Sequence, residues 1–181
     1  MNIRDALLKE KVHTKAQALA IAHYSCASKE NFSELIDCFL NNEYRVAQRA
    51  AWSVSWASQE EPEMVYPYIG VLVKQMQRTD VHPAIIRNSV RILEKIEIPE
   101  VYHGEVMDVC FGFAESPKTP IAIKAFALTT LFNLSNIYPE IKQELTLIIE
   151  SQMDNASPGF KSRAKKILQQ FNKEKSKNKS K

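Results

Sequence analysis

Four residues of one helical stretch could bind a partner through charge and aromatic surface: Arg45, Arg49, Trp52 and Trp56. They are 4, 3 and 4 positions apart, so at ~100° per residue they lie along one side of a helix. Guanidinium and indole groups side by side suit cation–π contacts, the anchoring of a protein partner, or stacking on nucleic-acid bases. We call these residues the Trp–Arg stripe. Its helix is expected to turn a different side to the core, through Val46, Ala50, Val54 and Ala57.

The Trp–Arg stripe has a second interpretation. Trp52 and Trp56 could instead pack against neighbouring helices, while Arg49 caps an acidic group in a turn. We expect Trp56 to be the more exposed of the two indoles, because it lies one turn nearer the end of its helix. Basic residues at corresponding places in later helices extend the candidate partner-binding set: Arg87, Arg91 and Lys124.

Patterns typical of enzymes are missing from the sequence. It has no Gly-rich phosphate loop, no Cys-x-x-Cys pair and no recognisable catalytic triad. The four histidines have no spacing with the three cysteines that suits a metal ion. We therefore expect no catalytic residue, no metal and no cofactor, and no small-molecule substrate is evident. The histidines and cysteines are His13, His23, His82, His103, Cys26, Cys38 and Cys110.

The elements that position the stripe belong to a repeat marked by proline. Pro-Glu-apolar triplets begin at Pro62, Pro99 and Pro139, separated by 37 and 40 residues. A second series is separated by 37 and 38 residues: Pro83, Pro120 and Pro158. Proline at the first helical position loses no hydrogen bond, and a following Glu favours the positive end of the helix dipole. Each period therefore contains two helix starts.

A series of basic residues has the same period. Its members are 34, 38, 37 and 37 residues apart: Lys15, Arg49, Arg87, Lys124 and Lys161. Each lies early in the second helix of a pair. Apolar periodicity then predicts five helix pairs: 2–11 with 14–27, 29–41 with 44–58, 62–78 with 83–96, 99–114 with 120–135, and 139–153 with 158–171. Ser28, Thr119 and Ser157 are the expected N-caps.

Composition indicates a folded core with a basic end. The chain has 181 residues, of which 45% are hydrophobic, so it can bury a core of ordinary size. Residues 1–157 carry a net charge of −5, and residues 158–181 carry +8. The Lys-rich residues 172–181 are predicted to form a disordered tail. Three widely spaced cysteines and the lack of a long apolar run favour a cytoplasmic chain with no membrane contact.

The chain resembles the HEAT-repeat family of the armadillo/HEAT superfamily. The resemblance rests on the proline-opened first helices and on the basic residue early in each second helix. Polar residues seven positions earlier look like the family's Asp…Arg ladder: Asn42 before Arg49, Asp80 before Arg87 and Asp154 before Lys161. The resemblance covers residues 1–171 and implies an all-α, right-handed α-solenoid of about five helix pairs. It also implies that the second helices line a concave face.

The function that this resemblance implies is a non-enzymatic scaffold binding a protein or peptide on the concave face. The Trp–Arg stripe is also similar to that of the DNA-alkylation-repeat glycosylases, HEAT-like proteins with Trp and Arg on a DNA-binding face. The negative charge of residues 1–157 differs from theirs. Nucleic acid is therefore the alternative partner.

Overall fold

The computed structural model describes residues 1–41 and 43–179 of the chain. Every regular element in these ranges is a helix, which confirms the predicted all-α class. No helix in the same ranges is both long and apolar enough to cross a membrane. The chain divides into two compact units, unit 1 over Met1–Ile98 and unit 2 over Pro99–Lys181. Each unit is described by itself.

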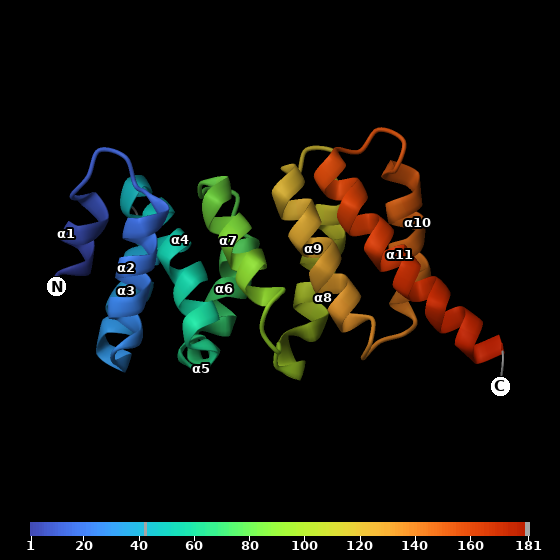
Figure 1. Cartoon of the computed structure of the whole chain (residues 1–181), viewed down its shortest axis with the longest axis horizontal. Helices are drawn as coiled ribbons and strands as arrows, with labels where there is room; N and C mark the ends of the chain where they lie inside the picture. Colours follow the sequence, from blue (N-terminus) through green and yellow to red (C-terminus); the bar gives the residue numbers. More distant parts are fainter. Residues whose placement is uncertain (42, 180–181) are drawn as a thin grey trace. The chain divides into compact units, whose positions relative to one another are not determined.

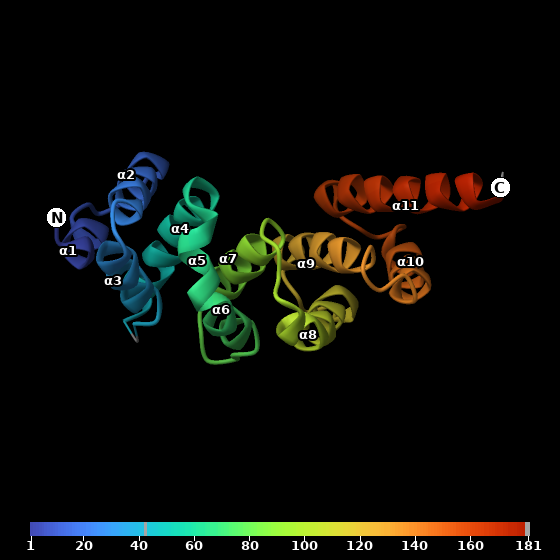
Figure 2. The same cartoon turned by 90° about the horizontal axis from the view of Figure 1, so that it is seen from below.

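Unit 1 consists of helices stacked pair upon pair (Figure 1). Its second helices α2, α4 and α7 form one layer, and their partners α3 and α6 form the other (Figure 2). The second helices pack against one another, α2 on α4 and α4 on α7. The elements are α1 (Ile3–Leu8), α2 (Lys15–Cys26), α3 (Lys29–Phe39), α4 (Tyr44–Glu60), α5 (Pro62–Val65), the 3₁₀ turn η1 (Tyr66–Tyr68), α6 (Ile69–Met76) and α7 (Pro83–Leu93).

Helix starts in unit 1 follow from capping residues and proline. Ser28 is the N-cap of α3, as predicted, and its hydroxyl accepts from the Asn31 amide. α2 begins with a capping box between Thr14 and Gln17, and Thr14 was not among the predicted N-caps. Pro62 and Pro83 are first residues of helices, as their positions in the repeat predicted. These local signals fix the chain direction at each turn.

The helix predicted over 62–78 is interrupted. Residues Tyr66–Tyr68 form a 3₁₀ turn between α5 and α6. Pro67 is the cause, because proline has no amide hydrogen to donate within a helix and its ring crowds the preceding turn. The apolar face continues across the break, since Val65 and Ile69 are both buried. The first helix of this pair is therefore broken but keeps its place in the stack.

The core of unit 1 is centred on α4. This helix packs against α1, α2, α3, α5 and α7. Its predicted core positions are confirmed, since these four side chains are fully buried: Val46, Ala50, Val54 and Ala57. Small side chains at these positions let neighbouring helices approach closely on several sides. The remaining side of α4 carries the Trp–Arg stripe.

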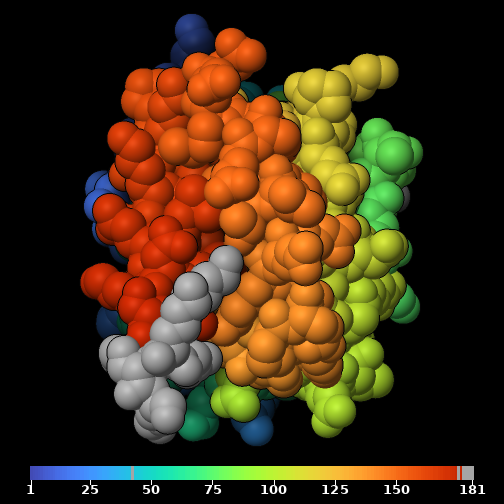
Figure 3. Space-filling view, turned by 90° about the vertical axis from the view of Figure 1, so that its right-hand side faces the viewer, coloured from blue at the N-terminus to red at the C-terminus, as the bar shows by residue number. Residues whose placement is uncertain are grey.

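Unit 2 is built in the same way. α9 packs against α8 and α11, and its buried side includes Ile123, Ala127 and Leu131. This confirms the helix predicted over 120–135 in a stretch rich in β-branched residues. Side chains of α10 and α11 lie side by side at one end of this unit (Figure 3). The elements are η2 (Glu100–Tyr102), α8 (His103–Glu115), α9 (Ile121–Leu134), α10 (Ile141–Gln152) and α11 (Pro158–Lys179).

Two boundaries in unit 2 differ from expectation. Thr119 was predicted as an N-cap, but the N-cap of α9 is Pro120, which has no side-chain cap. The helix predicted to end at residue 171 continues to Lys179; that residues 172–181 form a disordered tail stays a prediction, and residues 180 and 181 lie outside the described ranges. Contacts with the rest of unit 2 support the extension. Within the extension, the Glu174 carboxylate lies 2.6 Å from the Lys142 ammonium of α10; just before it, Phe171 packs on Phe132.

Candidate partner-binding site

The stripe residue Arg49 is buried and binds the end of α1. Its guanidinium donates to the carbonyl oxygens of Leu7, Glu10 and Lys11, at 2.6, 2.9 and 2.9 Å. A helix end leaves such carbonyls without intrahelical partners, so Arg49 satisfies the C-terminal end of α1. Burial lowers the pKa of Arg49, and the nearby charge of Arg45 lowers it further. Arg49 caps carbonyls rather than the acidic group that the second interpretation expected.

Arg45 lies one turn earlier on α4 and is exposed. Its guanidinium donates to the same Lys11 carbonyl at 2.8 Å. Both arginines of the stripe are thus directed toward the segment between α1 and α2. Arg45 is an exposed residue, whereas Arg49 is buried.

Trp52 packs against the histidine of that segment. The rings of Trp52 and His13 meet edge to face with centroids 5.9 Å apart. Both ring nitrogens of His13 are buried and have no hydrogen-bond partner in the described structure. Burial lowers the pKa of His13, and the charge of Arg49 lowers it further. Trp52 is half-buried, and its ring contact with His13 lies within unit 1.

Trp56 is flanked by two basic side chains from neighbouring helices. The Lys15 ammonium of α2 lies 4.8 Å from the ring centroid, and the Arg91 guanidinium of α7 lies 5.2 Å from it. The indole is half-buried, and its N–H is buried without a hydrogen-bond partner among the described residues. Arg87 lies one turn before Arg91 on α7 and is exposed. We call Lys15, Trp56, Arg87 and Arg91 the Trp56 cluster.

The side chains of Asp80 and Arg87 do not form the Asp…Arg ladder that the repeat predicted. Asp80 instead makes a two-contact ion pair with Arg78, at 2.9 and 2.6 Å. This pairing holds the pKa of the Asp80 carboxyl below its usual range. Lys161 reaches the backbone carbonyl of Asp154 at 3.1 Å. Asn42, the first member of the ladder, lies outside the described residues. Arg87 is consequently left without an acidic partner in its own turn.

Lys124, the last residue of the predicted set, belongs to unit 2 and is buried. Its ammonium donates to the Gln152 side chain at 2.6 Å, and the Gln152 amide donates to the Ala114 carbonyl at 2.7 Å. Burial lowers the pKa of Lys124. These bonds join α8, α9 and α10, so Lys124 has a structural role. The other six predicted residues belong to unit 1.

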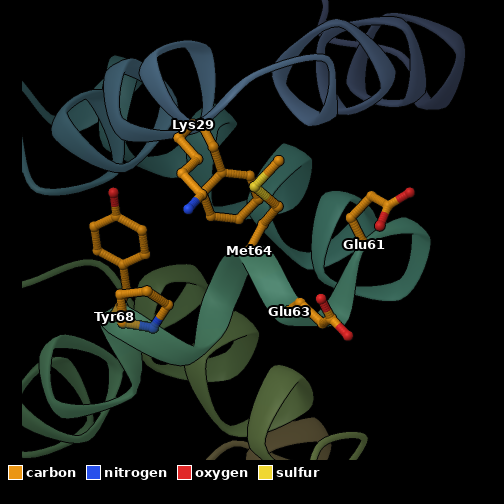
Figure 4. A pocket seen from close by; sticks show the side chains of 7 residues that line it. Lys29, Glu61, Glu63, Met64 and Tyr68 are labelled. Atoms are coloured by element: carbon orange, nitrogen blue, oxygen red, sulfur yellow. The ribbon is translucent and has the colours of Figure 1, made fainter.

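A separate hollow of about 320 Å³ lies in unit 1 between α3 and the α5–η1 segment. Its lining includes Phe32, which stacks on Tyr68 with ring centroids 5.8 Å apart. Figure 4 shows the Lys29 side chain reaching toward Tyr68, while the carboxylates of Glu61 and Glu63 point away from the Lys29 ammonium. The hollow therefore does not bring an acid and a base together.

Thiols and metal-binding side chains offer no alternative centre. Cys38 and Cys110 are buried, and burial raises the pKa of each thiol. The half-buried Cys26 has its pKa raised to about 11, by burial and by the charges of Glu60 and Glu61. Within residues 1–41 and 43–179, no three His, Cys, Asp or Glu side chains are grouped to hold a metal ion.

Sequence reasoning missed two residues of the site. Lys15 was recognised only as the first member of the basic series, and His13 only as a histidine without metal spacing. The series itself contained the missing signal, because it placed Lys15 on the second helix adjacent to α4. A long basic side chain on a neighbouring second helix can reach the ring of Trp56. No comparable signal identified His13.

We expect Arg49→Ala to destabilise unit 1 by about 2–4 kcal/mol, because the Leu7 and Glu10 carbonyls lose this donor, the Lys11 carbonyl keeps only Arg45, and a buried side chain is removed. Arg45→Ala is the matched control, with an expected cost of about 0.5 kcal/mol or less for an exposed side chain. Urea unfolding followed by circular dichroism measures both. Equal costs for the two variants would contradict the assigned role of Arg49.

His13 should make folding sensitive to acid. Its pKa is lowered from 6.5 in the folded chain, so the unfolded chain binds more protons once the pH falls below that value. The free energy of unfolding then decreases as the pH is lowered through the window between the two pKa values. His13→Phe removes two unpartnered nitrogens and should abolish this contribution without lowering stability at neutral pH. Thermal melts of both chains across this pH range measure the difference, and an unchanged acid dependence in His13→Phe would argue against the assignment.

Comparison with known proteins agrees with the helical-repeat architecture. A family model described as a HEAT repeat domain matches residues 4–171. No curated protein and no solved structure gave a match. The matched range includes nearly all of the helix pairs in both units and confirms the resemblance inferred from the proline and basic series. The chain belongs to the HEAT repeat family.

Proposed function

We propose that this protein is a non-enzymatic scaffold that binds a protein or peptide segment on the second-helix face of unit 1. We use this name for the outward side of α2, α4 and α7, with Lys15, Trp52, Trp56, Gln59, Arg87 and Arg91. The observation that carries the proposal is the environment of Trp56, a half-buried indole with two basic side chains over its ring. Trp and Arg side chains in such partly enclosed positions are typical anchors of protein interfaces.

Family membership supports the scaffold part of this proposal. Repeats of this kind present extended surfaces on which partners bind, and a fold of this type does not by itself imply an activity. We also propose the architecture expected from the sequence, a right-handed solenoid of about five helix pairs with the second helices on its concave side. The raised thiol pKa values of all three cysteines are consistent with a chain that performs no thiol chemistry.

Nucleic acid is the alternative ligand, because indole rings and guanidinium groups also stack on bases. The charge of unit 1 favours a protein instead. Residues 1–98 contain 12 Lys and Arg and 12 Asp and Glu, so unit 1 has no overall positive charge. A nucleic acid gains most of its affinity from many phosphate contacts, and a neutral unit is poorly suited to that mode.

Alanine variants of the two tryptophans should separate structural from binding roles. Trp52→Ala should cost about 3 kcal/mol of stability, because it opens a gap beside His13. Trp56→Ala should cost less stability, since its ring contacts flexible basic side chains. It should, however, weaken partner binding by about 2 kcal/mol. Thermal melts and affinity capture with wild-type and variant baits measure the two effects. If the Trp56→Ala bait captures the same protein as the wild-type bait at equal yield, the proposed face is wrong.

A further inference from the structure

Charge is distributed unequally between the two helix layers of unit 1. The second helices α2, α4 and α7 carry five Lys and Arg residues and a single acid, Glu60. Their partners α3, α5 and α6 carry two Lys and four acids. Because unit 1 as a whole is neutral, this segregation makes the second-helix face positive. A ligand of opposite charge is therefore attracted to that face.

The basic residues of α2, α4 and α7 are used in two ways. Arg45 and Arg49 donate to backbone carbonyls of the segment after α1. No ion pair joins Lys15, Arg87 or Arg91 to a carboxylate of the described chain. The one acid of these helices, Glu60, is already 2.5 Å from His23. Lys15, Arg87 and Arg91 therefore stay available to pair with the carboxylates of a partner.

The indole of Trp56 adds an unsatisfied donor at the same place. Its N–H is buried and has no acceptor in the described structure, and buried donors without acceptors are rare. The ring lies beneath Lys15 and Arg91, which hold it by cation–π contacts. Such contacts are weaker than a charge-assisted hydrogen bond to a carboxylate. A carboxylate can therefore compete with the ring for the Lys15 ammonium and the Arg91 guanidinium.

We propose that the segment bound at the Trp56 cluster is acidic. Two or three Asp or Glu carboxylates of a partner protein pair with Lys15, Arg87 and Arg91, and an apolar side chain between them packs on the indole. This inference rests on the proposed function and specifies the chemistry of its partner. A short acidic segment needs only these three cations. A long nucleic-acid strand would also be repelled by the acidic residues of α3, α5 and α6.

The test is a titration of the full-length chain followed in a two-dimensional proton–nitrogen NMR spectrum, in which Trp52 and Trp56 give the only two indole signals. The probes are a short peptide of Glu and Leu, a peptide of equal length with Gln in place of Glu, and a single-stranded oligothymidylate. We expect the Glu peptide to shift the Trp56 indole signal, with binding weakened by added salt. The Gln peptide should bind at least about tenfold more weakly, as measured from the same indole signal.

Arg87→Gln with Arg91→Gln should weaken binding of the Glu peptide by about tenfold, and a thermal melt checks that the variant is folded. Lys74→Gln is the matched control, since Lys74 is an exposed basic residue on α6; it should leave binding unchanged. Equal binding of the Gln and Glu peptides at Trp56 would overturn the acidic partner while leaving the proposed face intact. Shifts confined to α3, α5 and α6 would overturn the face itself. Tighter binding of the oligothymidylate through the same arginines would overturn both in favour of nucleic acid.

Discussion

Helices of unit 1 can bury their apolar sides only against other helices of the stack, and α4 is where this constraint is greatest. It is packed by α1, α2, α3, α5 and α7, and its inward residues are small or β-branched. With so many neighbours, only one narrow side of α4 is left for other contacts. The residues on that side must either complete the packing or meet solvent. The properties of the Trp–Arg stripe follow from this division.

Position along α4 decides how each stripe residue is used. Its first turns lie beside the end of α1, where free carbonyls require donors, and Arg49 and Arg45 supply them. Trp52 then meets the segment that follows α1 through His13. One turn later, the Trp56 ring is contacted by the basic side chains of Lys15 and Arg91. A single helical stripe thus changes from a structural to a candidate binding role within three turns.

The fold could be predicted from sequence because local signals coincide with the repeat. Proline and capping residues begin the helices, and apolar spacing gives the buried faces, as at Val46 and Val54 of α4. The site was harder to predict because side-chain partners depend on geometry between helices. Spacing alone cannot reveal that Arg49 reaches carbonyls of α1, that Asp80 pairs with Arg78, or that Lys124 is buried beside Gln152. Pro67 shows that local structure can also escape an apolar pattern, since its ring interrupts a helix whose apolar pattern continues.

Site-specific photo-crosslinking tests the central claim most directly, because it reports the bound surface before the partner is known. Gln59 is exposed and lies on α4 beside Trp56, and Tyr66 is exposed in η1, which leads into the first helix α6. A photo-reactive amino acid would replace each in turn in the full-length chain, expressed in its native cells. The account predicts a discrete protein adduct from position 59 and none from position 66. An adduct only from position 66, or an adduct of position 59 with nucleic acid, would contradict it.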